Sequence, residues 1–188
     1  KVRINRGMIT STTFNHYREI ENFDSFIFGS SRSQAFKCEN WSQYLDENTK
    51  AFHFDASNEN IWGITKKIEY IDELEDTIKN ALVIIDRTTL AGTSPEDGHL
   101  FISIPIISKS SKIEYYITFL KSSLNLKFLT AYIDYSIFKT YRNYMGTLIR
   151  KSKYNQLTNK NNCDIWYGLD KEIEYDSLGY YTKKVEDG

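Results

Sequence analysis

Proline, cysteine and histidine are scarce in this sequence. Its 188 residues include two prolines, two cysteines and three histidines. Two cysteines are too few for a disulfide framework, and the helical spacing of Cys38 with Ala35 and Trp41 instead predicts a buried thiol. Neither Cys38 nor Cys163 settles the redox compartment.

Strong net charge and long apolar runs are also missing. The formal net charge is −1, so the chain as a whole has no field that favours nucleic acid or an anionic membrane. No apolar run reaches the length of a membrane-spanning helix, and no signal peptide is visible. The chain begins at Lys1 rather than Met, which is consistent with a leader or anchor that has been removed.

Hydrophobic and aromatic residues are plentiful. The hydrophobic fraction is 40%, and 14 tyrosines and 11 phenylalanines bring the aromatic fraction to 15%. A chain of this length and composition is large enough to bury a core as one domain. The tyrosines fit either a tightly packed α/β body or a surface that faces sugars, and composition does not separate the two.

Strand and helix patterns alternate in the first half of the chain. Apolar runs predict short strands, and apolar residues at helical spacing predict a helix after each of the first two strands. Strand–helix–strand–helix–strand with short connections is typical of a parallel sheet. The predicted fold is therefore a three-layer α/β/α domain. Its strands are expected at 26–28, 51–54 and 81–85, and its helices at 33–45 and 61–79.

The flanking segments are expected to be less regular. The predicted single domain spans 1–188, with an N-terminal arm or lead-in strand at 1–22, a core at 23–90 and a helical or irregular extension at 91–188. Within that extension the pattern predicts the following segments: a loop at 91–99, a strand at 100–107 interrupted by Pro105, helices over 111–149 with a break near 122–125, and an exposed loop at 151–163.

Three loops follow the three predicted strands. They are Gly29–Arg32, Asp55–Gly63 and Asp86–Leu90, and parallel strands bring such loops to one edge of the sheet, where sites form. In the first loop, serines after a glycine have two interpretations. They either cap the following helix, or one of them presents a nucleophilic hydroxyl beside free N–H groups that hold an oxyanion or a phosphate.

The order of these loops resembles the SGNH/GDSL family of hydrolases and acyltransferases, in particular its envelope-associated branches such as D-alanylation and alginate-acetylation proteins. The stretches that carry the resemblance are "FIFGSSRS", "DASNENIWGI" and "ALVIIDRTTL". The resemblance implies Ser31 as the nucleophile. It also implies an oxyanion hole built from the N–H groups of Ser31 and Gly63, with Thr88 as a third donor. Arg32 would orient the turn or the substrate.

Two motifs of that family are absent. The usual Gly-x-Asn-Asp after the third strand is missing, and no Asp-x-x-His supplies the base. His53 falls within a predicted strand and His16 precedes the first strand, while His99, three residues after Glu96, is a candidate for a displaced base. We therefore expect a chain that lacks its C-terminal part and is inactive by itself, because a serine without a base is a poor nucleophile.

The function implied by the resemblance is that of an esterase or O-acyltransferase acting on acyl esters of a cell-envelope glycan. It implies a location at the bacterial cell envelope or its periplasmic face, a small acyl ester or glycan as substrate, no cofactor, no nucleic acid partner, and a membrane anchor outside this chain. A non-catalytic binding domain of the same fold and a phosphate or nucleotide binder remain alternatives. Asp55 and Asp86 suit either Mg²⁺ or turns and caps, and no zinc-ligand spacing is present.

Overall fold

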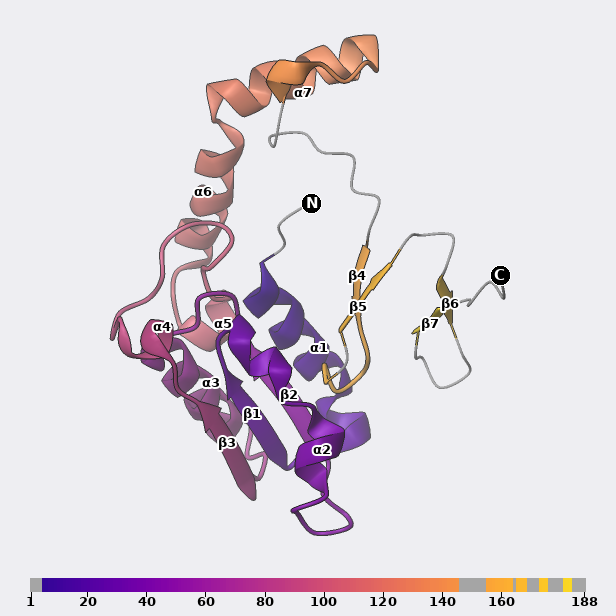
Figure 1. The fold of residues 1–188 in the computed structure, drawn as a ribbon. Coiled ribbons are helices and arrows are strands. Elements are labelled where there is room, and N and C mark those ends of the chain that lie inside the picture. Colours follow the sequence, from indigo (N-terminus) through magenta and orange to yellow (C-terminus); the bar gives the residue numbers. More distant parts are fainter. Residues whose placement is uncertain (1–4, 146–154, 164, 169–172, 176–180, 184–188) are drawn as a thin grey trace.

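A computed structural model describes residues 5–145, 155–163, 165–168, 173–175 and 181–183. Its centre is a parallel sheet in the order β2-β1-β3, made of β1 (Ser25–Gly29), β2 (Ala51–Asp55) and β3 (Asn80–Ile84). Helices lie on both faces of the sheet (Figure 1). The predicted three-layer α/β/α fold and its three parallel strands are confirmed.

The predicted helix at 33–45 is two short pieces. They are a 3-10 turn, η1 (Ser31–Ala35), and α2 (Cys38–Ser42). Phe36 and Lys37 between them have extended backbones, with ψ of 106° and 137°. The helix predicted at 61–79 ends earlier, as α3 (Ile61–Glu73), because Glu75 takes a left-handed conformation with φ of 58°.

The N-terminal arm is a helix, so the expectation of an irregular segment or lead-in strand was wrong. α1 (Arg6–Glu21) begins where the Asn5 side chain accepts a hydrogen bond from the Met8 N–H at 2.9 Å. Its inward positions include Thr10 and Ser11 as well as Phe14. These polar residues hide the apolar period by which an amphipathic helix is normally found.

Between residues 87 and 145 the regular segments are helical. They are α4 (Arg87–Leu90), α5 (Pro105–Ser108), α6 (Lys112–Ser123), α7 (Leu126–Phe138) and η2 (Asn143–Met145). The predicted break near 122–125 is confirmed, because Asn125 caps α7. The strand expected at 100–107 was wrong: Pro105 takes the first position of α5, where a missing N–H costs nothing.

The C-terminal part forms antiparallel pairs. β4 (Asn155–Thr158) pairs with β5 (Ile165–Gly168), and β6 (Ile173–Tyr175) pairs with β7 (Tyr181–Lys183). The expected exposed loop at 151–163 was wrong for 155–163, since part of it is β4 and three of its other residues are buried: Asn159, Asn162 and Cys163. Residues 151–154 lie outside the described residues.

The two faces of the sheet are packed differently. One face carries a largely aromatic cluster. Its members come from β1, β2, α1, α3 and α5 and from the connection between α1 and β1. They are Phe14, Phe23, Phe26, Phe28, Phe52, Phe54, Ile64, Tyr70, Ile71 and Ile107. The opposite face holds a smaller cluster, made of Ile27, Cys38, Ala51 and Cys163. The side chains of His53 and Ser33 lie on the same side and are hydrogen-bonded to each other.

The two edges of the sheet also differ. Beside the outer edge of β2, the backbone N–H of His53 donates to the Asn161 carbonyl at 2.9 Å. On the other side, no strand among the described residues pairs with the outer edge of β3. Val83 and Ile85 there are 36% and 59% exposed.

Candidate functional site

The loops after β1 and β3 meet at the carboxyl edge of the sheet, as the sequence predicts. The Ser30 hydroxyl donates to Asp86 Oδ2 at 2.6 Å. Arg32 Nη1 donates to the same carboxylate oxygen at 3.0 Å and to Thr88 Oγ1 at 3.2 Å. Four side chains from two distant loops therefore form one hydrogen-bonded group.

Gly29 makes the sharp turn out of β1 possible. Its φ of +154° is rarely adopted by residues with side chains. A Cβ at this position would lie 3.0 Å from the Ser33 Cβ and 3.1 Å from the Ile84 carbonyl oxygen. The glycine thus lets η1 begin directly above the end of the central strand.

The two serines after Gly29 have different roles. Ser30 is buried, with 3% of its surface exposed, and its Oγ accepts from the Arg32 N–H at 3.3 Å as the cap of η1. Ser31 is exposed, and within the described part of the chain its hydroxyl makes no hydrogen bond. The capping interpretation therefore applies to Ser30, while Ser31 carries the accessible hydroxyl.

Asp86 is held as a carboxylate. The hydroxyl of Ser30, the backbone N–H of Thr89 and the guanidinium of Arg32 together keep its pKa well below the usual range. Its other oxygen, Oδ1, caps α4 by accepting from the Thr89 N–H at 2.9 Å. Asp86 thus stabilises the third loop and orients the side chains of the first.

The two carboxylates suggested as magnesium ligands, Asp55 and Asp86, already accept hydrogen bonds from other side chains. Asp55 is fully buried and accepts two hydrogen bonds from the Arg6 Nε, while Asp86 is bonded to Ser30 and Arg32. Among the described residues, no group of three or more His, Cys, Asp or Glu side chains is placed to hold a metal ion. The cap interpretation is confirmed for Asp86, the N-cap of α4, whereas Asp55 lies at the end of β2 and its side chain pairs with Arg6 instead of capping a helix.

In the second loop, Gly63 lies in the first turn of α3. Its N–H donates to Asn60 Oδ1 at 3.1 Å, so the cap already uses the hydrogen that the oxyanion role would need. A Cβ on Gly63 would overlap the carboxylate of Glu59, which pairs with the buried Lys67. Burial raises the pKa of Glu59. Gly63 therefore has a packing role, and its oxyanion role stays a prediction.

A small hollow lies at the carboxyl end of β2. Its lining includes Trp62, Phe101, Glu96 and Ser103. The Asn60 side chain fixes its rim by donating to the Ser94 carbonyl at 2.8 Å and to Glu96 at 3.2 Å.

No histidine within the described residues hydrogen bonds to Ser31. His53 is 1% exposed, and its Nε2 lies 2.8 Å from the Ser33 Oγ. Because the Ser33 hydroxyl donates to the Ser30 carbonyl at 2.7 Å, Nε2 must carry the hydrogen in this contact. Burial lowers the pKa of His53 to about 4, so it is a neutral core residue, as its strand position predicts.

The other two histidines are placed against aromatic rings. The His16 ring packs against Tyr17 at 4.6 Å between centroids, and the His99 ring lies 6.2 Å from Phe119. The role of His99 as a displaced base stays a prediction without a supporting contact.

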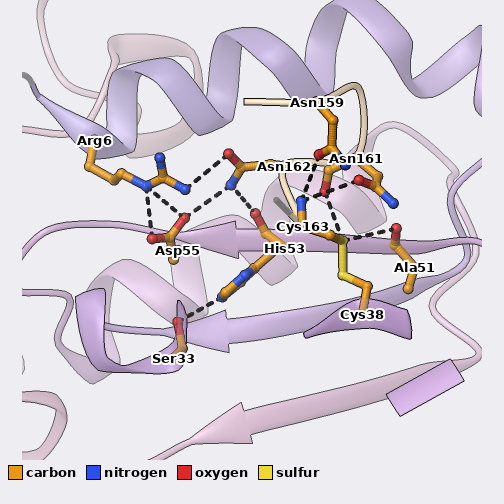
Figure 2. The surroundings of a disulfide bond; sticks show 10 residues. All are labelled: Arg6, Ser33, Cys38, Ala51, His53, Asp55, Asn159, Asn161, Asn162 and Cys163. Atoms are coloured by element: carbon orange, nitrogen blue, oxygen red, sulfur yellow. Dashed lines mark hydrogen bonds and ion pairs between the residues drawn. A yellow bond between two sulfur atoms is a disulfide. The ribbon is translucent and has the colours of Figure 1, made fainter. Parts of the chain in front are cut away.

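Sequence reasoning missed a buried network on β2 (Figure 2). Arg6 Nε donates to both oxygens of Asp55, at 3.1 and 2.9 Å, and its Nη2 donates to Asn162 Oδ1 at 3.0 Å. The Asn162 amide donates in turn to Asp55 at 3.0 Å. These residues are too far apart in the chain for a local pattern to connect them.

The two cysteines form a disulfide, so the prediction of a buried thiol at Cys38 was wrong. Cys38 and Cys163 are 125 positions apart, with their Cα atoms at 5.5 Å. The Asn159 side chain accepts from the Cys163 N–H at 3.0 Å and shapes the loop around the bond. An even cysteine count was the one sequence signal for this link, but spacing alone does not pair distant cysteines.

Comparisons with known proteins found no matching family model, no matching curated protein and no matching solved structure.

Proposed function

We propose that this chain carries serine-dependent ester chemistry, as an esterase or O-acyltransferase on acyl esters of a cell-envelope glycan, with Ser31 as nucleophile. The observation that supports it is the division of labour after Gly29. Ser30 is buried and bonded to Asp86, whereas Ser31 is exposed at the carboxyl end of the central strand. This is the edge at which open parallel sheets hold their sites.

In this proposal the Ser31 Oγ attacks the acyl carbonyl while its proton passes to a general base. The ester C–O bond then breaks, so that the acyl-enzyme forms and the alcohol of the ester leaves with the proton from the base. The N–H of Ser31, at the start of a helical turn, faces no partner within that turn and can donate to the developing oxyanion. Thr88 Oγ1 accepts from Arg32 Nη1, which leaves its own hydrogen to donate to the oxyanion beside the Ser31 N–H. The acyl group then leaves to water or to a glycan hydroxyl.

The placement of the histidines favours a second candidate, a non-catalytic binding domain of the same fold. None of them hydrogen bonds Ser31 within the described residues, so a catalytic role needs a base from elsewhere. A phosphate or nucleotide site on the same turn is disfavoured, because the charge of Arg32 is paired with Asp86 at 3.0 Å.

The test is labelling of the full-length protein with a fluorophosphonate probe, which reacts with activated serines. We expect the label on the peptide that contains Ser31, identified by mass spectrometry, and its loss in Ser31→Ala. Ser94→Ala, a change at an exposed serine on a neighbouring loop, is the matched control and should keep the label. A folded, full-length wild-type protein that takes up no label would overturn the ester proposal and leave the binding domain as the better candidate.

A further inference from the structure

The helices α6 and α7 expose an unusual amount of apolar surface. Of 21 large apolar or tyrosine side chains that are exposed in the described residues, twelve lie between 113 and 144. Figure 1 shows both helices extending away from the α/β body. Contiguous exposed apolar patches on soluble proteins mark surfaces of interaction.

The exposed residues of α6 lie on one side of the helix. They recur at intervals of three and four positions, which places them on a single face, and they are between 42 and 72% exposed. These residues, which we name the α6 stripe, are Ile113, Tyr116, Ile117, Leu120 and Leu124.

The opposite side of α6 faces the body. Tyr115 is buried and its hydroxyl donates to Met8 Sδ at 3.2 Å, and Phe119 packs against the His99 ring. The α6 stripe is therefore not needed for the contact between α6 and the body. The helix has an inner face already, and the stripe is a second one.

α7 repeats this arrangement. Leu126, Ile133 and Ile137, which we name the α7 stripe, are 79, 55 and 66% exposed and recur at seven and four positions. Part of the other side of α7 is covered by the segment that follows it. Ala131 there is fully buried, and Asp134 pairs with Arg142 at 3.2 Å.

Charge is distributed unevenly between these helices and the remainder of the chain. Residues 112–142 hold five Lys or Arg and two Asp or Glu, a formal charge of +3, so the other residues carry −4 of the total of −1. The near-neutral total conceals this segregation. Four exposed lysines accompany the stripes: Lys112, Lys121, Lys127 and Lys139.

We propose that α6 and α7 bind an anionic lipid surface, lying in the interface with the two stripes among the acyl chains and the lysines at the headgroups. Apolar residues on one helix face, with lysines and tyrosines beside them, are what an interfacial helix needs. Among the described residues, no helix has the length and apolarity to cross a bilayer. The contact is therefore a peripheral one, and it does not depend on the chemistry proposed for Ser31.

The experiment is co-sedimentation of the full chain with two kinds of vesicle, phosphatidylcholine alone and phosphatidylcholine mixed with phosphatidylglycerol. We expect the partition coefficient to be at least about tenfold higher on the anionic vesicles and to fall as salt is added. Ile117→Asp/Leu120→Asp should abolish binding to both. Lys121→Glu/Lys127→Glu should abolish only the preference for the anionic vesicles.

Matched controls change exposed residues of the same kinds elsewhere. Tyr44→Asp alters a side chain that is 86% exposed, and Lys37→Glu/Lys50→Glu makes the same change in net charge as the lysine pair; both should bind like wild type. Because all these positions are exposed, an unchanged circular dichroism spectrum checks that the variants fold. Equal binding by stripe variants and controls, or no binding by wild type, would overturn the proposal. So would a light-scattering mass of two chains that returns to one in Ile117→Asp/Leu120→Asp without vesicle binding, because the stripes would then join two copies.

Discussion

The two faces of the central sheet are covered and stabilised by different kinds of interaction. On one face, Phe14 of α1 packs its ring 5.1 to 5.8 Å from the rings of three strand phenylalanines: Phe26, Phe52 and Phe54. On the other, the apolar cluster is small, and it is covered by α2 and by the loop at 159–163. The Cys38–Cys163 disulfide and the buried Arg6, which pairs with Asp55 and donates to Asn162, hold this loop in place.

Buried apolar area on one face and cross-links on the other serve the same purpose, which is to stabilise the layer that covers the sheet. The aromatic face gains its stability from apolar surface removed from water. The opposite face has less apolar area and is stabilised by a disulfide and a buried ion pair. Removing one member of either pair destabilises the fold strongly. Changes to the two faces should therefore differ in their dependence on pH and reductant.

Removing the central ring of the aromatic face should have the largest effect. Phe14→Ala leaves a cavity among at least four rings, and we expect the free energy of unfolding in urea to fall by about 4 kcal/mol at any pH. Phe36→Ala, at a residue that is 46% exposed, is the control and should cost much less. A loss below about 1 kcal/mol at Phe14 would mean that this face is not closed as described.

The buried ion pair comes next. Asp55→Asn keeps the size of the side chain but leaves the charge of the buried Arg6 without its counter-ion, and should cost about 3 to 4 kcal/mol. Asp72→Asn, at an exposed aspartate, should leave the unfolding midpoint in urea nearly unchanged. Equal midpoints in the two variants would contradict the role given to Asp55.

Breaking the disulfide should cost slightly less. Cys38 and Cys163 close a loop of more than a hundred residues, and reduction should lower the free energy of unfolding by about 3 kcal/mol. The same reductant should not affect Cys38→Ala/Cys163→Ala, which already lacks the link. If wild type and this variant unfold alike before reduction, the link contributes nothing to stability.

The smallest effect is a dependence on pH that belongs to one face only. The folded-state pKa of His53 is lowered by burial from 6.5 to about 4, so between these values the unfolded chain binds the extra proton. Stability from this residue is then complete above about pH 6.5 and is lost as the pH falls towards 4, with a loss of about 2 kcal/mol already reached at pH 5. Unfolding curves of wild type and His53→Gln at pH 7 and pH 5 measure it. The same loss in both proteins would contradict this assignment.

The sequence predicted the parts of the fold that depend on local pattern. The continuous apolar runs around Ile27, Phe52 and Val83 are strands in the structure, and the turn at Gly29 could be anticipated because strand, glycine and serines follow directly. Ser30 and Ser31 could not be told apart from the sequence. Which hydroxyl is buried depends on Asp86, 56 positions away from Ser30.

The features that were missed depend on partners distant in the chain. α1 has polar inward residues such as Thr10, which donates to the Asp55 carbonyl at 2.8 Å and needs no apolar period. Asn162 looks like a loop residue until Arg6 and Asp55 are placed beside it. Local propensity carries no information about such contacts, which only the folded arrangement creates.

The unequal edges of the sheet give the protein a direction of growth. At β2, residues 159–163 already use the backbone of His53, whereas β3 presents its outer edge with Val83 and Ile85 exposed. Among the described residues, the outer edge of β3 is therefore the one place at which a further strand, from the same chain or from another molecule, can join this sheet. Productive extension and unwanted self-assembly must compete for that single edge, and a proline or a lysine placed in β3 would suppress both together.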